Sequence, residues 1–507
     1  MLEAGTLWEL IEARAAASPD ALMAVDELGR ELTFGDYRHQ VEVAAAGLVA
    51  EYGIGPGDVI TWQLPTWLES MVLVGAIARL GATQNPVLPI YREREVGFCV
   101  RQARAKLLVV PTGFGTFDFV AMAEAITGPL DGVSVMTSAR SLPTGDPATL
   151  PPPPASDDDV RWLFYTSGTT ADPKGAQHTD ATIRAVASGM SQRLAITDQD
   201  RNALAFPFTH VGGITWLFTS LMTGMVNILF EAFVPDVVVE VLSAQGVTLA
   251  GSGTAFHQAY LAAQRSSDTP IFPHVKNFPG GGAPKPVPFY YEMKEAFGVP
   301  IVSGYGLTEA PILVMGSVDD LDEDLANSEG APMPGVELKL VKLDGTLAAV
   351  GEEGEIRAKA PQLMKGYLDP ALDADGFDEE GFFRTGDLGT LNERNMLSIT
   401  GRLKDIIIRK GENVSAKEVE DLLFAHPQVL DVAVIGLPDP ERGERVCALV
   451  STPEGAEPLA FDDMVAFLKG QGLMVQKIPE QLEHLDVIPR NPTGKILKHE
   501  LRKAYGA

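Results

Sequence analysis

The sequence predicts an α/β protein, in which a large N-terminal domain of layered α/β subdomains ends in a small β-barrel and is followed by a small α+β C-terminal domain. Helical and strand-like patterns alternate over residues 1–150, which favours layers around a largely parallel sheet. Short alternating strands with frequent glycine fill residues 330–400, as in a small barrel or sandwich. A mixed pattern of helices and strands then runs to the C-terminus.

The N-terminal elements follow from apolar spacing and from glycine. Helices are expected over residues 41–51 and 68–80, and a glycine lies just beyond each of them, as is common where helices end. Strands are expected over residues 58–64 and 107–110, where apolar side chains run together. The proline-rich stretch 151–159 could separate two domains. We interpret it as a surface loop within one domain, because the strand after it leads into a candidate site.

Further along the chain, strands lead into polar segments. Residues 203–207 form an expected strand before a histidine and two glycines, and residues 301–309 an expected buried strand that runs into a polar corner. The C-terminal domain is expected to begin near residue 401. Its expected elements are helices over residues 416–424 and 461–470 and strands over residues 429–435 and 445–451.

Composition describes an acidic but otherwise ordinary globular protein. The 507 residues are 45% hydrophobic, and 40 Lys and Arg against 68 Asp and Glu give a net charge of −28. Such an acidic surface argues against nucleic acid or an anionic membrane as the main partner. Two cysteines provide neither a disulfide framework nor a zinc site. The N-terminus has the pattern of an acidic amphipathic helix, and the longest apolar run is residues 71–78, so we expect no targeting or transmembrane segment and a cytoplasmic location.

A polar loop after an apolar strand is the first candidate site. Residues 162–165 are apolar, and small hydroxyl and glycine residues follow them, ahead of a lysine. Exposed backbone N–H groups and one lysine can together hold a phosphate chain, although such clusters are also common in surface turns. The Walker pattern does not fit, because the lysine precedes the glycine and Ala176 stands where Ser or Thr is needed. The candidate phosphate-binding residues are Thr166, Ser167, Gly168, Thr169, Thr170 and Lys174.

This loop resembles the T-S-G-[ST]-T-G-x-P-K-G motif of the adenylate-forming, or AMP-binding, enzymes. That superfamily contains acyl-CoA synthetases, peptide-synthetase adenylation domains and beetle luciferase. Ala171 is a departure, because the family usually has glycine there. Further family motifs follow in the family's order and extend the resemblance over nearly the whole chain. They are GGGAP at residues 280–284, YGLTE at 305–309, RTGDLG at 384–389, GRLKDIIIRKGENV at 401–414 and PTGK at 492–495.

The resemblance implies a site for ATP and Mg²⁺. Each residue type fits its role: backbone without side chains allows flat contact with adenine, a carboxylate can accept hydrogen bonds from both ribose hydroxyls, and a glutamate offers Mg²⁺ a hard oxygen. Taken alone, the same residues fit plain turns and a helix start. The implied residues are Gly282, Ala283, Pro284, Tyr305 and Gly306 around adenine, Asp387 and Arg402 at the ribose, Thr308 at phosphate and Glu309 at the metal.

The resemblance also implies how the other substrates bind and how the chain moves. An N-terminal AMP-binding domain would span residues 1–401, and a mobile C-terminal domain, residues 402–507, would rotate about Lys404. The catalytic set would be Lys495, which reaches across from the mobile domain, with Thr308, Glu309 and His210. The acyl pocket would be lined by His210, Val211, Gly212, Gly213, Trp216, Gly281 and Leu307, and CoA would contact Arg409, Lys410 and Gly411.

The implied function is an ATP-dependent acid–thiol ligase that forms acyl-CoA through an acyl-adenylate and releases AMP and pyrophosphate. ATP, Mg²⁺ and coenzyme A are the implied cofactors. No charged residue stands out in the pocket to hold an amino group, so the acid is expected to be fatty, alicyclic or steroidal, or aromatic. An adenylating enzyme that serves a carrier protein, a luciferase-type oxidase and a non-catalytic nucleotide-binding relative stay open as alternatives. The expected partners are the acid, ATP and CoA, with a homodimer left open.

Overall fold

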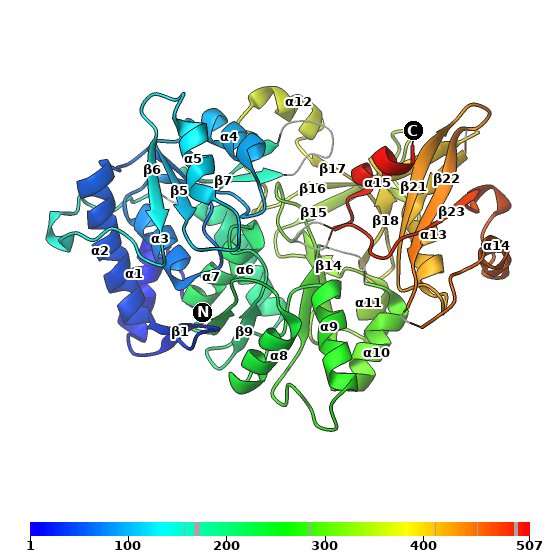
Figure 1. Ribbon diagram of the computed structural model, residues 1–507, viewed down its shortest axis with the longest axis horizontal. Coiled ribbons are helices and arrows are strands. Elements are labelled where there is room, and N and C mark those ends of the chain that lie inside the picture. Colours follow the sequence, from blue (N-terminus) through cyan, green and yellow to red (C-terminus); the bar gives the residue numbers. More distant parts are fainter. Residues whose placement is uncertain are drawn as a thin grey trace.

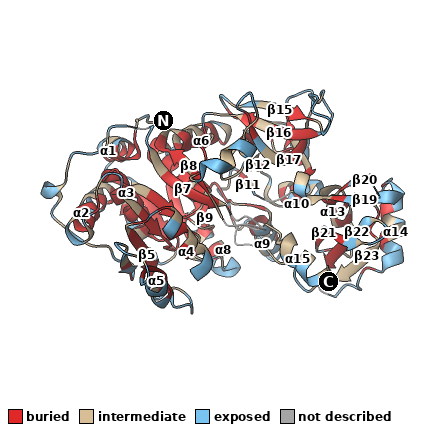
Figure 2. Cartoon of the chain, turned by 90° about the horizontal axis from the view of Figure 1, so that it is seen from above, coloured by how far each residue is buried: buried red, intermediate tan, exposed pale blue. Residues whose placement is uncertain are grey.

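The chain forms a large N-terminal part and a smaller C-terminal part, which occupies one end of the molecule (Figure 1). The computed structural model describes residues 1–156, 158–166, 173–282, 285–410, 412–453, 455–490 and 495–506. Figure 2 shows the same division from above: buried residues gather around β7, β8 and β9 in the large part and around β21 and β22 in the small part. The α/β architecture expected from the sequence is confirmed.

A six-stranded sheet organises the N-terminal half. Its neighbours are parallel except for the last pair, β7 and β8, which form an antiparallel hairpin. Because β6 and β7 share this sheet, the proline-rich stretch between them lies within one layer system, as expected. In spatial order the strands are β6 (Ser134–Ser138), β5 (Leu107–Pro111), β3 (Val59–Trp62), β4 (Thr83–Pro86), β7 (Val160–Thr166) and β8 (Lys174–Thr179).

Helices cover both faces of this sheet. One shared core joins it to a second, four-stranded sheet through α1 (Leu7–Ala17), α2 (Phe34–Tyr52), α3 (Leu68–Arg79), α6 (Asp180–Arg193) and α7 (Val211–Thr223). On the opposite face, α4 (Glu93–Gln102) and α5 (Phe119–Thr127) pack against β5 and β7. The second sheet has the order β2 (Glu31–Thr33), β1 (Leu22–Asp26), β10 (Val226–Leu229) and β9 (Arg201–Leu204).

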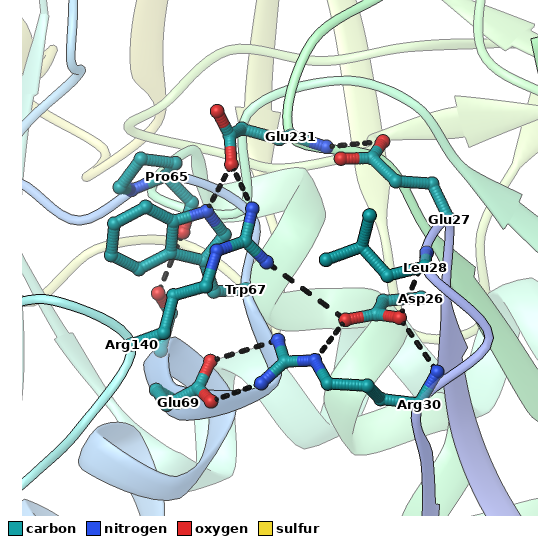
Figure 3. A network of polar contacts seen from close by, with 10 residues as sticks. Asp26, Glu27, Leu28, Arg30, Pro65, Trp67, Glu69, Arg140 and Glu231 are labelled. Atoms are coloured by element: carbon teal, nitrogen blue, oxygen red, sulfur yellow. Dashed lines mark hydrogen bonds and ion pairs between the residues drawn. The ribbon is translucent and has the colours of Figure 1, made fainter. Parts of the chain in front are cut away.

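A network of ion pairs and hydrogen bonds ties the two sheets together at their edges (Figure 3). Arg30 pairs with Asp26 at 2.7 Å and with Glu69 at 2.6 Å. Arg140 stacks over the indole ring of Trp67, 4.9 Å from its centroid. Both Arg140 and the indole N–H of Trp67 bind the carboxylate of Glu231, which follows β10. Asp26 is 4% exposed, and a buried charge is costly unless it is paired, so its contact with Arg30 matters most in this network.

The remainder of the large part carries two further four-stranded sheets. The segment between β10 and the first of them forms α8 (Pro235–Ala244) and α9 (Thr254–Arg265). The first comprises β11 (Phe278–Gly281), β12 (Ile301–Tyr305), β13 (Val314–Met315) and β14 (Ala331–Pro332), with α10 (Val287–Phe297) and α11 (Asp322–Asn327) between strands. The small β-barrel expected at the end of the large part is instead an open antiparallel sheet in the described residues, with β15 and β18 at its two edges. Its strands are β15 (Glu337–Val341), β16 (Gly354–Lys359), β17 (Phe383–Leu391) and β18 (Leu397–Arg402), with α12 (Asp373–Gly376) before β17.

The C-terminal part has its own core and its own sheet. The strand order is β20 (Glu412–Ser415), β19 (Ile406–Arg409), β22 (Gly443–Ser451) and β21 (Asp431–Asp439), and β23 (Gln481–His484) adds to β22 in parallel. Its helices are α13 (Ala416–Phe424), α14 (Phe461–Gly470) and α15 (Lys498–Tyr505). Short 3₁₀ turns, labelled η, lie at η1 (Pro147–Thr149), η2 (Pro370–Leu372), η3 (Leu403–Asp405) and η4 (Val475–Lys477).

No helix in the described ranges has both the length and the apolar character that a membrane span needs.

Candidate active site

A carboxylate, a phenol and a guanidinium meet where β12, β17 and β18 come together. The hydroxyl of Tyr305 donates to Asp387 Oδ2 at 2.7 Å, and Arg402 Nε lies 2.8 Å from Asp387 Oδ1. Asp387 and Arg402 are direct cross-strand partners in the antiparallel pair β17–β18, so the ladder register itself creates their ion pair. Asp387 is only 3% exposed. Burial, followed by the adjacent Asp387 charge, raises the pKa of Tyr305 well above its ordinary value, which keeps its hydroxyl a donor.

The lysine of the C-terminal part approaches the same cluster. Lys495 is half-buried, and burial, with repulsion from Arg402 and Lys404, lowers its pKa to about 8. Asp387 acts in the opposite direction on the same ammonium group. Lys495 therefore lies within electrostatic reach of the Asp387–Arg402 pair, although these residues are far apart in the sequence. Lys404, in η3 directly after β18, is exposed.

Thr308 and Glu309 form the polar corner after β12, and a buried histidine supports it. His178 in β8 lies with Nε2 2.8 Å from the carbonyl oxygen of Thr308 and Nδ1 3.1 Å from the hydroxyl of Thr182. A carbonyl oxygen only accepts, so Nε2 carries the proton and donates. Burial lowers the pKa of His178 to about 4, and the ring is neutral at pH 7.

Glu309 and Lys174 both contact the same tyrosine, Tyr367, although they are far apart in the sequence. The hydroxyl of Tyr367 donates to Glu309 Oε1 at 2.8 Å, and Lys174 Nζ lies 5.3 Å from the centroid of the Tyr367 ring. Lys174 begins β8 directly opposite Thr166, the last residue of β7. The loop that joins them contains Ser167, Gly168, Thr169 and Thr170, which lie outside the described residues.

A small cavity connects His210 to the Thr308 corner. His210 is the N-cap of α7, where its Nδ1 accepts the backbone N–H of Gly212 at 3.1 Å, and this arrangement leaves the ring proton on Nε2. Burial lowers the pKa of His210 to about 4. The walls are Pro86, Val87, Leu88, Tyr91, Phe164, Tyr165, Thr209, His210, Val211 and Thr308.

Five of the predicted acyl-pocket residues are not among the walls of this cavity, namely Gly212, Gly213, Trp216, Gly281 and Leu307. At Gly213 a side chain would come within 2.6 Å of the Phe208 backbone, and at Gly212 within 3.3 Å of the His210 ring. Close packing at the start of α7 thus explains both glycines. Trp216 is buried in the large core. Leu307 packs against the core beside β16, and at Gly281 a side chain would come within 2.8 Å of the Gly304 carbonyl oxygen.

The remaining predicted nucleotide residues follow the ends of the paired strands β11 and β12. Gly306 cannot carry a side chain, because a Cβ there would lie 2.1 Å from the backbone nitrogen of Ile312. Gly282 follows β11 with φ of +75°, a conformation that glycine adopts without strain. Ala283 and Pro284, its predicted partners against adenine, lie outside the described residues.

The predicted CoA residues lie on the β19–β20 hairpin of the C-terminal part. Arg409 forms an ion pair with Glu480. In this arrangement the Arg409 guanidinium is therefore paired within the C-terminal part. Lys410 is exposed, and its backbone N–H donates to the carbonyl oxygen of Arg442. Gly411 lies outside the described residues.

Two residues at this site, His178 and Tyr367, belong to none of the sequence motifs described above. His178 lies four residues after Lys174, on the strand that leaves the polar loop, and Tyr367 follows a glycine in the segment KGYLDP. Neither position carries a local signal of function. Their partners, Thr308 and Glu309, are distant in the sequence, and only the tertiary structure brings them together.

The residues present fit Mg²⁺ bound together with phosphate. In the described part of the chain, no three His, Cys, Asp or Glu side chains gather as a metal cage. Mg²⁺ commonly uses one or two carboxylates, retained waters and substrate phosphates instead. Glu309 provides one such carboxylate, 8% exposed, and the described residues leave the rest of a coordination shell to the substrate and water.

Comparison with known proteins gives consistent matches over the whole chain. The family model described as AMP-binding enzyme matches residues 11–368, and the one described as AMP-binding enzyme C-terminal domain matches residues 418–495. The chain is 32% identical to the medium-chain fatty-acid–CoA ligase of Escherichia coli K12, over 96% of this chain and 88% of that protein. It is 31% identical to the long-chain-fatty-acid–CoA ligase FadD13 of Mycobacterium tuberculosis, over 91% of each.

Among solved structures, ATP-bound MatB from Rhodopseudomonas palustris superposes with a TM-score of 0.89. The two sequences are 26% identical, and the match covers 98% of this chain and 99% of that chain.

Proposed function

Because this chain belongs to the AMP-binding enzyme family, we propose that it is an ATP-dependent acid–thiol ligase that joins a carboxylic acid to coenzyme A. One observation carries the proposal. Lys495 from the C-terminal part lies within electrostatic reach of Asp387 and Arg402 on the large part. This arrangement supplies a cation for a substrate whose carboxylate and phosphates are all negative.

The first half-reaction joins the acid to AMP. A carboxylate oxygen attacks the α-phosphorus of ATP, the bond from that phosphorus to the bridging oxygen breaks, and pyrophosphate leaves. Two anions must meet in line, so positioning and charge neutralisation supply most of the catalysis. Lys495 would bind the carboxylate and the α-phosphate together. Asp387 would accept hydrogen bonds from the ribose, with Arg402 beside it.

The polar corner would hold the other phosphates. Lys174 and the hydroxyl loop that begins at Thr166 would bind the β- and γ-phosphates, and Thr308 would donate its hydroxyl to phosphate. Glu309 would hold Mg²⁺, which when bound neutralises phosphate charge. Tyr305, with Gly282 and Gly306, would lie against adenine.

The second half-reaction transfers the acyl group. The thiol of CoA loses its proton and attacks the acyl carbon, the bond from that carbon to the phosphate oxygen breaks, and AMP leaves. We propose that the chain after β18 rotates about Lys404 between the two steps, while Arg402 stays with the large part, as hinge motions commonly complete a second site. Rotation would withdraw Lys495 and bring Arg409 and Lys410 to CoA.

The substrate is proposed to be an uncharged acyl body with one carboxylate. His210 would lie beside that carboxylate. Apolar side chains make up much of the neighbouring wall (Pro86, Val87, Leu88, Phe164 and Val211), which supports a fatty, alicyclic or aromatic acid. The fatty-acid–CoA ligases among the relatives favour a fatty acid. A cytoplasmic location stays a prediction, which cell fractionation would test. A homodimer also stays a prediction, which light scattering would test.

The decisive experiment measures AMP release from ATP with a panel of carboxylic acids, with and without CoA. The proposal expects AMP in quantity only with CoA and for one class of acid. Pyrophosphate exchange without CoA-stimulated turnover would instead support an enzyme that serves a carrier protein. ATP binding without exchange for any acid would contradict the ligase.

A further inference from the structure

One tyrosine contacts both Glu309 of the polar corner and Lys174 of β8, and the proposed mechanism gives this tyrosine no role. Tyr367 is 5% exposed and lies in the segment between β16 and β17. Its hydroxyl donates to Glu309 Oε1 at 2.8 Å, while Lys174 Nζ lies 5.3 Å from its ring centroid. A cation at this distance from an aromatic ring is attracted to its face.

The backbone around Tyr367 is held on both sides. Residues 365–368 pair with β8: the N–H groups of Lys365 and Leu368 donate to the carbonyl oxygens of Gln177 and Gly175, at 2.8 and 2.7 Å. The Tyr367 N–H donates to Asp373 Oδ1 at 2.9 Å.

The same segment also holds the corner after β12. The N–H of Met364 donates to the carbonyl oxygen of Glu309 at 2.8 Å. The tyrosine is therefore fixed between the strand that carries Lys174 and the corner that carries Glu309.

We propose that Tyr367 is a positioning residue for the metal–nucleotide complex: its hydroxyl holds one oxygen of the Glu309 carboxylate so that the other can bind Mg²⁺, and its ring supports Lys174. This inference rests on the proposed ATP site. A direct Lys174–Glu309 ion pair would neutralise both groups and remove them from the ligand. Tyr367 instead gives each group its own contact, on different parts of one side chain.

The phenol contributes an uncharged donor. A tyrosine hydroxyl carries one O–H, and the 2.8 Å contact directs it at Glu309 Oε1. A neutral donor orients the carboxylate without cancelling its charge, and the charge remains available to a cation.

The experiment separates the hydroxyl from the ring. Titration calorimetry on the full chain would measure the dissociation constant of ATP with and without Mg²⁺ for the natural protein and for Tyr367→Phe. We expect the gain in affinity due to Mg²⁺ to shrink about tenfold in Tyr367→Phe, as fits a lost hydrogen bond to a charged group. Metal-free ATP binding should be unchanged, because the ring under Lys174 remains. Mn²⁺ bound in the presence of ATP, followed by electron paramagnetic resonance, should weaken in parallel.

The chain offers a matched control. Tyr290 donates its hydroxyl to Asp322 Oδ1 at 2.6 Å, and Lys285 Nζ lies 5.4 Å from its ring centroid, so Tyr290→Phe removes the same kind of contact on α10. It should leave both dissociation constants unchanged. A Tyr367→Phe protein that keeps the natural Mg²⁺ gain, or that loses ATP affinity equally with and without metal, would overturn the inference alone. Failure of the natural protein to bind ATP would overturn the proposed function as well.

Discussion

Asp387 combines deep burial with a full set of neighbours, and this makes it informative to change. Its two oxygens meet Tyr305 and Arg402, and its N–H donates to Thr385 Oγ1 at 3.1 Å. We predict that Asp387→Asn raises the KM for ATP about tenfold or more, because an amide offers the ribose hydroxyls a weaker, uncharged acceptor. Steady-state kinetics at saturating acid and CoA would measure it.

A carboxylate outside the site provides the control for Asp387. Asp378 pairs with Lys339 at 2.9 Å and with Arg357 at 3.2 Å in the same all-β unit. Asp378→Asn should lower the free energy of unfolding without changing the KM for ATP. Equal KM values for the two variants would remove Asp387 from the ribose site.

The lowered pKa of Lys495 leads us to expect that the adenylation rate depends on pH. Burial, with Arg402 and Lys404 nearby, lowers its pKa to about 8, so the ammonium is charged below that pH and neutral above it. The proposed role of Lys495 in adenylation needs the charge. We predict that kcat/KM for ATP in pyrophosphate exchange falls as the pH rises through about 8, since this parameter reports groups of the free enzyme.

Two variants of Lys495 test the origin of that profile. Lys495→Arg keeps the charge at high pH, and its decline near pH 8 should disappear. Lys495→Ala should reduce exchange by a factor on the order of 100 to 1,000 yet spare thioester formation from a supplied acyl-adenylate. An unchanged alkaline decline in Lys495→Arg would assign the profile to another group.

At the scale of elements, α7 begins at a residue with two proposed roles. His210 caps the helix by accepting the N–H of Gly212 and also lines the cavity. We predict that His210→Ala costs about 1 kcal/mol of unfolding free energy through the lost cap and raises the KM for the acid. His210→Asn should restore the stability, because asparagine caps well, but not the KM. Denaturant unfolding and kinetics on both variants would separate the roles, and full recovery of the KM in the asparagine variant would leave the cap as the only role.

Element boundaries show where local sequence suffices. The helices expected over residues 416–424 and 461–470 agree with α13 and α14 at both ends. Ser415 caps α13 by accepting the N–H of Glu418, whereas α14 follows Ala460 without a side-chain cap, so its apolar spacing alone marks it. The helix expected over residues 41–51 instead begins at Phe34, where Thr33 accepts the N–H of Asp36. Phe34 and Tyr37 are buried in the first turns, but the polar run Arg38, His39 and Gln40 interrupts the apolar spacing before Val41. The cap itself was in the sequence.

At the scale of the molecule, the proposed rotation depends on a short connection. Arg402 ends β18 of the large part, η3 follows, and β19 of the C-terminal sheet begins at Ile406. We predict that Lys404→Pro leaves pyrophosphate exchange near its natural rate and blocks thioester formation, because proline fixes φ and removes the freedom that rotation needs.

Lys404→Ala is the matched control for the hinge. It removes the exposed side chain but keeps the backbone freedom, so both half-reactions should proceed. Separate assays of pyrophosphate exchange and of acyl-CoA formation would compare the two variants. Natural rates for both steps in Lys404→Pro would place the hinge elsewhere.

The sequence by itself determined the layered α/β class, most elements and the family, because these rest on local patterns and on ordered motifs. It named Asp387, Arg402 and Lys495 as separate motif residues. Only the tertiary structure decided that they meet: β-ladder register pairs the first two, and the placement of the C-terminal part brings the third to them. His178 and Tyr367 emerged only there, since a hydrogen bond between distant residues leaves no periodicity or spacing in the sequence. The shape of the cavity beside His210 was likewise decided by packing, which placed Gly213 against a neighbouring backbone and Trp216 in the core.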